Sequence, residues 1–447
     1  MDVARSFHPP SSSCEAHILI IGAGITGLVL AQALKKASIP FTVFERDPHV
    51  SFRGKGWGLT IHWSLQTFIS LLPQHLVDRL PEVYVDRQAS ERGENGNFLF
   101  FDLRSGEARW KVPPNKRIRL SRERLRSLLL EGLDVQWSKR LASFTTSLPT
   151  STKSDTPTIT VHFTDSTTYT GTLLIGADGV HSCVRSTLLS YHHTPDSQKI
   201  TTYHLPIRLL GVSVPYPASL ALKLRALDPF FFQGGDPATN AFMYFSFLSS
   251  PGNYPVSEDS AARDTYECQI IISWPYRSGF RGEKEPLDVP EDHEERVKVM
   301  KKLADGWAEP FRECVLSIPE KGTAVTAITL EDFVPSEGIW DNLGGRVTLV
   351  GDAAHAMTMF RGEGANHGIT DVAILLESLL PNLSRPSSSS SASLEHAIHT
   401  YEREMIRRTA PAVLTSRRAC MDAHDYNRID DQSPLISRRL MVTEEER

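Results

Sequence analysis

Three glycines near the N-terminus, Gly22, Gly24 and Gly27, have the spacing Gly-x-Gly-x-x-Gly between an apolar run at 17–21 and a helix-forming stretch at 25–37. Residues without a Cβ let the chain turn sharply and let a pyrophosphate approach the backbone, while the following helix offers unpaired N–H groups to the anion. Glu45 ends the next apolar run, 23 positions after Gly22, where its carboxylate can accept hydrogen bonds from an adenosine ribose. The pattern predicts a dinucleotide site; the alternative is a glycine-rich turn without a ligand.

The glycine motif alone does not distinguish NAD from FAD, and two later segments bear on that choice. Gly-Ala-Asp-Gly at 176–179 directly follows an apolar strand and contains Asp178. Gly-Asp-Ala-Ala-His at 351–355 follows another apolar strand and contains Asp352. It continues through Gly-Glu-Gly-Ala-Asn at 362–366 into an apolar helix.

In this order and spacing, the three segments resemble those of the aromatic-hydroxylase class of FAD-dependent monooxygenases, typified by para-hydroxybenzoate hydroxylase. The chain is more similar to the tetracycline-oxidising and fungal secondary-metabolite members of that class, and the resemblance covers nearly the whole chain. The residues that it implies for FAD are Gly22, Gly24, Gly27 and Glu45 at the ADP half, Gly58 in a glycine-rich stretch bordering the cofactor, Arg122 at the start of a helix, Asp178, which is also implicated in nicotinamide binding, Asp352 at the ribityl chain, and Ala365 at the flavin end of a helix. For Arg122 the alternative is an ordinary solvated basic face, because four more arginines lie within five positions of it.

The helix that starts near Gly364 has a physical reason to lie at the flavin. A reduced flavin carries negative charge, which backbone N–H groups at a helix N-terminus stabilise. The same region departs from the family pattern at three positions. Met359 stands where the family has a proline close to the substrate, Glu363 stands where it has a glutamine, and Arg361 adds a charge.

These motifs need a parallel sheet to position them. Further strand candidates at 158–163, 172–175 and 346–350 are separated by long insertions, so the sequence predicts a discontinuous Rossmann-like FAD domain. Between them, β-type runs such as 241–248 and 268–274 are broken by Gly- and Pro-containing turns, which predicts an antiparallel-sheet substrate domain. The predicted class is therefore α/β, with an FAD-binding domain at 15–85, 110–190 and 336–382, a sheet domain at 86–109 and 191–335, and C-terminal helices at 393–447.

Composition limits the alternatives. With 40% hydrophobic residues, 23% charged residues and a formal charge of −5, the chain offers no reason to expect nucleic acid as a partner. Five scattered cysteines predict neither a disulfide framework nor a metal site, and His192 and His193 have no partner at ligand spacing. The polar N-terminus and charged C-terminus favour a cytoplasmic protein without an integral membrane anchor.

The sequence therefore predicts an FAD-dependent monooxygenase that uses NADPH or NADH and O2 on a small organic, aromatic or polyketide-like substrate. It identifies no catalytic base. Residues 230–232, Tyr244 and Phe245 line the substrate pocket or belong to the plain core. The alternatives are a flavin-dependent oxidase or oxidative cyclase that inserts no oxygen, and a binding module of the same fold. A halogenase is disfavoured because its Trp-x-Trp-x-Ile-Pro signature is absent.

Overall fold

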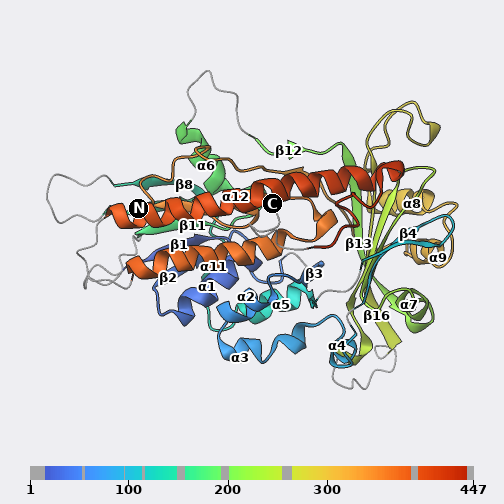
Figure 1. Ribbon diagram of the computed structural model, residues 1–447, viewed down its shortest axis with the longest axis horizontal. Helices are drawn as coiled ribbons and strands as arrows, with labels where there is room; N and C mark the ends of the chain where they lie inside the picture. The colour runs from blue at the N-terminus through green and yellow to red at the C-terminus, as the bar shows by residue number, and fades with distance from the viewer. Residues whose placement is uncertain are drawn as a thin grey trace.

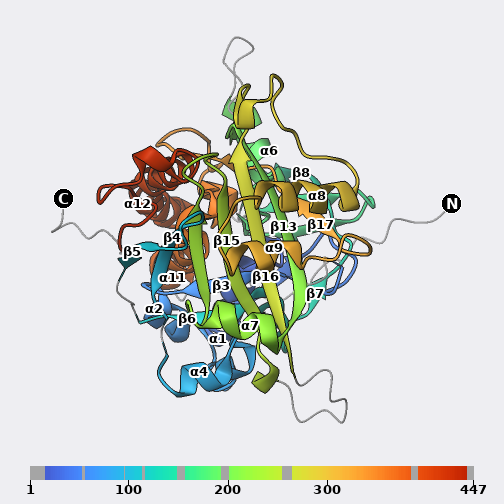
Figure 2. The same ribbon diagram turned by 90° about the vertical axis from the view of Figure 1, so that its right-hand side faces the viewer.

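The computed structural model describes residues 16–52, 56–94, 96–112, 116–147, 157–192, 201–253, 264–383 and 391–439. Cys14, His193 and the two chain ends considered above lie outside these ranges. Two large sheets organise the described chain. One belongs to the part that carries the glycine turn, and the other forms the side shown face-on in Figure 2.

The first sheet has five parallel strands. Their spatial order is β19 (Val347–Leu349), β11 (Leu173–Gly176), β1 (Ile18–Ile21), β2 (Phe41–Phe44) and β7 (Val135–Gln136). The pairing aligns Ile20 with Ile175 on one side and with Val43 on the other. The central strands β1 and β11 carry no polar side chain and are buried along their whole length, as is usual in parallel sheets that are covered on both faces. Since these strands come from four distant parts of the chain, the prediction of a discontinuous Rossmann-like domain is confirmed.

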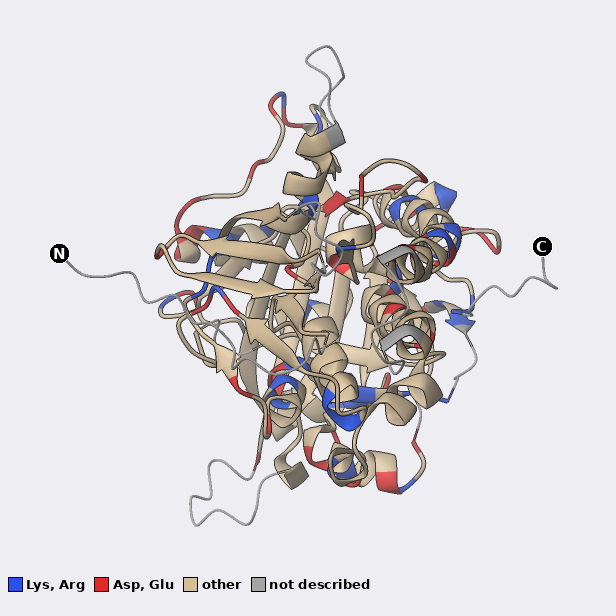
Figure 3. Ribbon diagram, turned by 90° about the vertical axis from the view of Figure 1, so that its left-hand side faces the viewer, with Lys and Arg blue, Asp and Glu red and all other residues tan. Residues whose placement is uncertain are grey.

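Helices lie to one side of the parallel sheet (Figure 3). A small antiparallel sheet packs against Phe44 of the parallel sheet. The helices are α1 (Ile25–Lys36), α2 (Leu65–Leu71), α3 (Gln74–Val77), α5 (Arg122–Leu129), α11 (Gly364–Leu383) and α12 (Ser391–Ala423). The small sheet consists of β8 (Leu141–Thr146), β9 (Ile159–Phe163) and β10 (Thr168–Gly171). It packs on the parallel sheet through Phe163 and Tyr169, whose ring centres each lie 4.8 Å from that of Phe44.

The second sheet has seven strands. Their order is β17 (Val325–Ala327), β13 (Ile207–Pro217), β16 (Thr265–Pro275), β15 (Phe242–Ser249), β14 (Phe231–Gly235), β4 (Phe98–Asp102) and β5 (Ala108–Val112). Neighbours are antiparallel except β14 and β4, which run parallel with Gln233 opposite Phe100. Helices α7 (Ala218–Arg225), α8 (His293–Leu303) and α9 (Phe311–Leu316) cover its outer face (Figure 2).

Helix α12 crosses the molecule from the parallel sheet to the seven-stranded sheet (Figure 1). Tyr401 donates a hydrogen bond to the carbonyl oxygen of Leu349 on β19, at 2.7 Å. His424, just beyond the helix, bonds to the hydroxyl of Ser273 on β16 at 2.8 Å. The helix therefore ties the two sheets together.

The remaining elements are short. They are β3 (Gly58–Ile61) paired with β6 (Ile118–Ser121), β12 (Tyr203–His204) paired with β18 (Glu331–Asp332), α4 (Arg87–Glu91), α6 (Cys183–His192), α10 (Asp352–His355), and the 3-10 turns η1 (Leu80–Val83), η2 (Pro251–Asn253), η4 (Phe280–Gly282), η5 (Met359–Arg361) and η6 (Tyr426–Arg428). The predicted α/β class with an antiparallel sheet domain and C-terminal helical segment is confirmed. Among the helices of the described ranges, none is long and apolar enough to cross a membrane.

Candidate functional site

Two cavities adjoin, one at the edge of the parallel sheet and the other against the seven-stranded sheet. One, of about 570 Å³, is lined by the turn between β1 and α1, the end of β2 and the start of α5; we call it the turn cavity. The other, of about 400 Å³, lies between the inner face of the seven-stranded sheet and the start of α11; we call it the sheet cavity. Trp57, Arg122 and Asp352 line both cavities, so these residues mark their junction.

The three glycines of the β1–α1 turn serve different purposes. A Cβ on Gly22, whose φ is +109°, would lie 2.4 Å from the carbonyl oxygen of Ala177, and one on Gly27 would lie 2.1 Å from that of Gly22. Close packing therefore requires glycine at both positions. A Cβ on Gly24 would meet nothing within 4 Å, and this residue lines the turn cavity. Gly22 also lines the turn cavity, whereas Gly27 lies behind it.

Glu45 follows β2 and is tied to the glycine turn. Its Oε2 accepts a hydrogen bond from the N–H of Ala23 at 2.8 Å, and its Oε1 accepts one from the N–H of Asp47 at 3.0 Å. Arg126 on α5 approaches Glu45 at 3.7 Å and donates to the carbonyl oxygen of Ala23 at 2.8 Å. The carboxylate is thus held at the wall of the turn cavity beside the turn.

Asp178 also lines the turn cavity, but its carboxylate caps a helix. Its oxygens accept hydrogen bonds from the hydroxyl of Ser182 at 2.5 Å and from the N–H groups of Cys183 and Val184 at 2.7 and 3.2 Å. The last two begin α6. Burial raises the pKa of Asp178, and these hydrogen bonds oppose that effect. The acid therefore shapes the cavity wall through the loop that it anchors.

Sequence reasoning assigned no role to Arg185, which joins two of the motifs. Its Nη1 donates to the carbonyl oxygens of Asp352 and Ala353 at 3.2 and 2.9 Å, and its Nη2 donates to that of Val180. The guanidinium also lies 4.5 Å from the ring centre of Phe333. Its position six residues after the Gly-Ala-Asp-Gly segment at 176–179 is the signal that the sequence offers.

Asp352 is presented to the cavities by a buried polar network. Asp371 of α11 accepts hydrogen bonds from the N–H of Gly351 at 2.7 Å and from His355 at 2.6 Å, and Arg408 of α12 donates to its other oxygen. Burial opposes ionisation of Asp371, but His355 and Arg408 hold its pKa well below the usual range. Asp352 is surrounded by protein, and its exposed surface faces the two cavities that it lines. Burial of the carboxyl group raises its pKa.

The first turn of α11 borders the sheet cavity, as Gly364 and Ala365 line it. A Cβ on Gly364 would lie 3.4 Å from an oxygen of Asp352, so these two motif segments are in close contact. Asn366 fixes the turn against the β3 region, since it accepts from the N–H of His62 at 3.0 Å and donates to the carbonyl oxygen of Thr60 at 3.1 Å.

Gly58 begins β3 and also lines the sheet cavity. A Cβ there would lie 2.0 Å from Nη2 of Arg119, so glycine is required by the close approach of that guanidinium. Arg122 begins α5 and donates its backbone N–H to the carbonyl oxygen of Trp57 at 3.1 Å. Arg122 is partly exposed and lines both cavities, so it lies at their junction.

Strand alternation sorts the aromatic candidates. Phe231 and Tyr244 point to the inner face of the seven-stranded sheet and line the sheet cavity. Phe232 and Phe245 point to the outer face, where their rings stack with centres 4.9 Å apart in the core beneath α9. Phe230 is buried and does not line the cavity.

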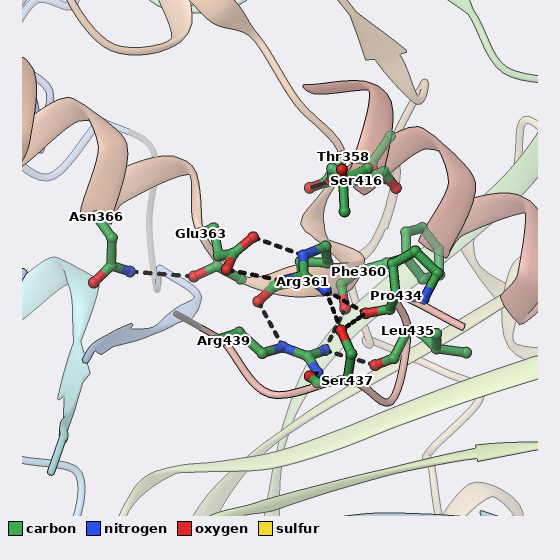
Figure 4. Close-up of polar contacts among 12 residues, drawn as sticks. Thr358, Phe360, Arg361, Glu363, Asn366, Ser416, Pro434, Leu435, Ser437 and Arg439 are labelled. Carbon is green, nitrogen blue, oxygen red and sulfur yellow. Dashed lines mark hydrogen bonds and ion pairs between the residues drawn. The ribbon is translucent and has the colours of Figure 1, made fainter. Parts of the chain in front are cut away.

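Of the three departures from the family pattern, Met359 and Arg361 line the sheet cavity, and Glu363 lies beside Arg361 (Figure 4). Arg361 binds both oxygens of Glu363, at 2.7 and 3.1 Å, and also donates to the carbonyl oxygen of Pro434 and the hydroxyl of Ser437. Met359 is 39% exposed and also lines the cavity. Residues 430–439, which we call the C-terminal segment, are thus docked on the 359–363 loop.

The part of the chain that the structure describes contains no group of three or more His, Cys, Asp or Glu side chains placed to hold a metal ion. Cys183, Cys268, Cys314 and Cys420 are free thiols.

Comparison with known proteins agrees with this geometry. The FAD binding domain family matches residues 15–208 and 338–410. The chain is 55% identical over 430 residues to a "Probable FAD-dependent monooxygenase" of Arthroderma benhamiae, covering 96% of each chain. It is 40% identical to the FAD-dependent monooxygenase dbaB of Emericella nidulans, covering 83% of this chain and 88% of that one.

Among solved structures, 2,6-dihydroxypyridine-3-hydroxylase from Arthrobacter nicotinovorans has the same fold. Its TM-score is 0.68 at 19% identity, over 95% of this chain and 97% of that one. The family match and the two relatives together decide the class. The chain belongs to the FAD-dependent monooxygenases of the aromatic-hydroxylase type.

Proposed function

We propose that this enzyme uses NADPH or NADH and O2 to hydroxylate or epoxidise a small, electron-rich aromatic or polyketide-like substrate, in secondary metabolism. The observation that carries the proposal is the pair of adjoining cavities. One surrounds a glycine turn suited to a dinucleotide, and the other has an aromatic wall of suitable size for a small molecule. Trp57, Arg122 and Asp352 stand where the two meet.

The residues present fit FAD. In the turn cavity, Gly22 and Gly24 would face the pyrophosphate, since the open space beside Gly24 leaves the backbone accessible there. Glu45 would accept hydrogen bonds from the adenosine ribose. Arg122 and Asp352 would bind the middle of the cofactor at the junction. Gly58 and Ala365 would border the ring in the sheet cavity. Gly27 would act through packing of the turn, and Asp178 through the loop that it caps, beside which a nicotinamide would bind transiently.

Bound FAD supplies electron transfer from the nicotinamide to O2 and the transfer of one oxygen atom to the substrate. The protein's part is to position the reactants, exclude water and stabilise charge. N–H groups in the first turn of α11 would stabilise negative charge on the ring, since Gly364 and Ala365 lack bulky side chains there. Phe231, Phe242 and Tyr244 would hold an aromatic substrate against the sheet.

His62 is a titratable group at the wall of the sheet cavity. Burial, together with the positive charges of Arg439, Arg117 and Arg361, lowers the pKa of His62 to about 3. The imidazole is therefore neutral near pH 7 and can accept or donate a hydrogen bond without carrying charge.

The test combines flavin content with the fate of oxygen. Purified protein should carry a flavin absorbance band, and acid denaturation should release free FAD. With a panel of phenolic and polyketide-like compounds, NADPH and ¹⁸O2, the true substrate should gain one labelled oxygen atom per NADPH oxidised.

A product that has lost two hydrogen atoms and gained no label would replace this proposal with an oxidase or oxidative cyclase. Asp352→Ala provides the matched control, because its loss of the junction carboxylate should remove flavin, and with it label incorporation. Loss of a charged hydrogen-bond partner costs about 1.5–3 kcal/mol of binding free energy.

A further inference from the structure

An ion pair lies directly before helix α11. Arg361 and Glu363 are 9% and 4% exposed, and the guanidinium binds both carboxylate oxygens, as described above. The backbone carbonyl oxygen of Glu363 accepts a hydrogen bond from the N–H of His367 at 3.0 Å, so Glu363 stands at the N-terminal end of the helix. A buried ion pair is weak evidence for stability, because desolvation of both charges opposes their attraction. Its position at the end of α11 that borders the sheet cavity is therefore the informative feature.

The 359–363 loop and the C-terminal segment brace each other (Figure 4). From the loop, Arg361 donates to the carbonyl oxygen of Pro434 and, at 2.9 Å, to the hydroxyl of Ser437. From the segment, Arg439 donates to the carbonyl oxygens of Arg361 and Phe360 at 3.3 and 3.4 Å. The orientation of Arg361 is thus fixed by residues that follow it by 73 and 76 positions.

The two ends of the loop are anchored as well. Thr358 donates to the carbonyl oxygen of Ser416 on α12 at 2.9 Å. At the other end, Asn366 donates to the carbonyl oxygen of Gly362 at 3.3 Å and to that of Thr60 on β3 at 3.1 Å. The charges of Arg361 and Glu363 therefore cannot move away from the start of α11 unless these hydrogen bonds break.

The two partners of the pair differ in their relation to the sheet cavity. Arg361 lines that cavity, as do Gly364 and Ala365 in the first turn of α11, whereas Glu363 is not among the residues that line it. The N–H groups of a helix N-terminus favour negative charge beside them, and a buried charge is screened less than one in water. A carboxylate at this point without its cation would oppose negative charge in the cavity. The guanidinium of Arg361 offsets that effect.

We propose that Arg361 is a positioning residue that neutralises Glu363 at the start of α11, and that this pair sets the reduction potential of the flavin bound in the adjoining cavity. The inference rests on the proposed function in placing the flavin ring beside Gly58 and Ala365. A reduced flavin carries negative charge, so loss of the cation alone disfavours reduction and loss of the carboxylate alone favours it. The C-terminal segment contributes by holding the guanidinium in place.

Two single substitutions test the proposal, because they change the charge in opposite directions. Glu363→Gln leaves the positive charge of Arg361 and should raise the two-electron reduction potential of bound FAD. Arg361→Gln leaves the negative charge of Glu363 and should lower that potential. Each shift should reach at least tenfold in the equilibrium constant of reduction, or about 30 mV. The double variant, with both changes, should return to the wild-type potential. Anaerobic reduction in equilibrium with a reference dye, followed by flavin absorbance, measures each potential without turnover.

Two further variants separate charge from structure. Glu91→Gln is the matched control, because it removes the acid of an exposed Arg87–Glu91 pair on α4, whose atoms lie 2.7 Å apart, and should leave the potential unchanged. Arg361→Lys keeps the positive charge and should keep a potential close to that of the wild type. A shift in Arg361→Lys as large as that in Arg361→Gln would overturn the proposal. Shifts of the same sign in Arg361→Gln and Glu363→Gln, or loss of FAD from both, would also overturn it, since the pair would then act only through structure.

The outcomes separate this inference from the proposed reaction. Opposite shifts that cancel in the double variant support the role of the pair even if no labelled oxygen enters the product. A labelled product together with potentials that are the same in all variants supports the reaction and overturns the role of the pair.

Discussion

Gly24→Ala separates the cofactor-binding role of the glycine turn from its packing role. Gly24 has φ −75° and ψ 178°, which alanine adopts without strain, and its Cβ would meet no atom within 4 Å. The apoprotein should therefore keep its free energy of unfolding to within about 0.5 kcal/mol, as surface substitutions do.

FAD binding should respond differently. The new methyl group would occupy the space through which a pyrophosphate approaches the backbone, and overpacking of this kind costs about 1–3 kcal/mol. That cost raises the dissociation constant of FAD roughly 5- to 150-fold. Fluorescence titration of the flavin-free protein with FAD measures it.

Gly27→Ala is the matched control. Its Cβ would lie 2.1 Å from the backbone oxygen of Gly22, so helix α1 must move away from the turn. We expect this variant to lower the stability of the apoprotein itself by about 1–3 kcal/mol, seen in thermal unfolding without FAD. If Gly24→Ala bound FAD like the wild type, the turn would not receive the phosphates. If it destabilised the apoprotein as much as Gly27→Ala, the assignment of open space at Gly24 would be wrong.

Three further outcomes are expected. Asp371→Asn leaves His355 and Arg408 buried without their shared carboxylate, so thermal unfolding should show a loss of about 3–5 kcal/mol, and an unchanged unfolding curve would contradict the buried network. Burial lowers the pKa of His424 to about 4 from 6.5; below pH 6.5 the unfolded chain binds a proton that the folded chain excludes, so stability falls, by roughly 2 kcal/mol at pH 5. His424→Gln should flatten this pH dependence between pH 7.5 and 5, and an equally steep loss would remove His424 as its cause. NADPH oxidation should rise at least about tenfold when the true substrate is present, and equal rates of anaerobic flavin reduction with and without substrate would exclude such control.

The dinucleotide part of the site could be predicted because its determinants are local in sequence. The glycine turn, Glu45 and the strands on either side lie within 30 residues, and each follows from the conformational needs of a βαβ unit. The two later motifs, containing Asp178 and Asp352, likewise follow strands of the same parallel sheet. Parallel pairing brings their carboxyl ends to one edge, so distant segments with one local signature converge there.

The sheet cavity was less predictable because its walls depend on register and long-range docking. One residue of register decides whether Phe231 or Phe232 faces the cavity, and alternating aromatic runs carry no signal of which face is inward. In the sequence, Arg119 and Arg122 are both members of one group of closely spaced arginines. Only the pairing of β3 with β6 shows that Arg119 packs on Gly58 and that Arg122 begins a helix at the junction.

The departures at Met359, Arg361 and Glu363 also show that sequence patterns do not reveal long-range contacts at the sheet cavity. In the sequence alone, they are differences from the family pattern at a place close to the substrate. The family pattern therefore does not predict how this chain positions its substrate. In the folded protein the charge of Arg361 is matched by Glu363, and Arg361 also binds the carbonyl oxygen of Pro434, 73 positions away. A changed residue in that loop is therefore accompanied by a new partner from the C-terminal segment. The loop keeps its place at the start of α11, while the wall that it shares with the substrate is built by a part of the chain that local patterns do not connect to it.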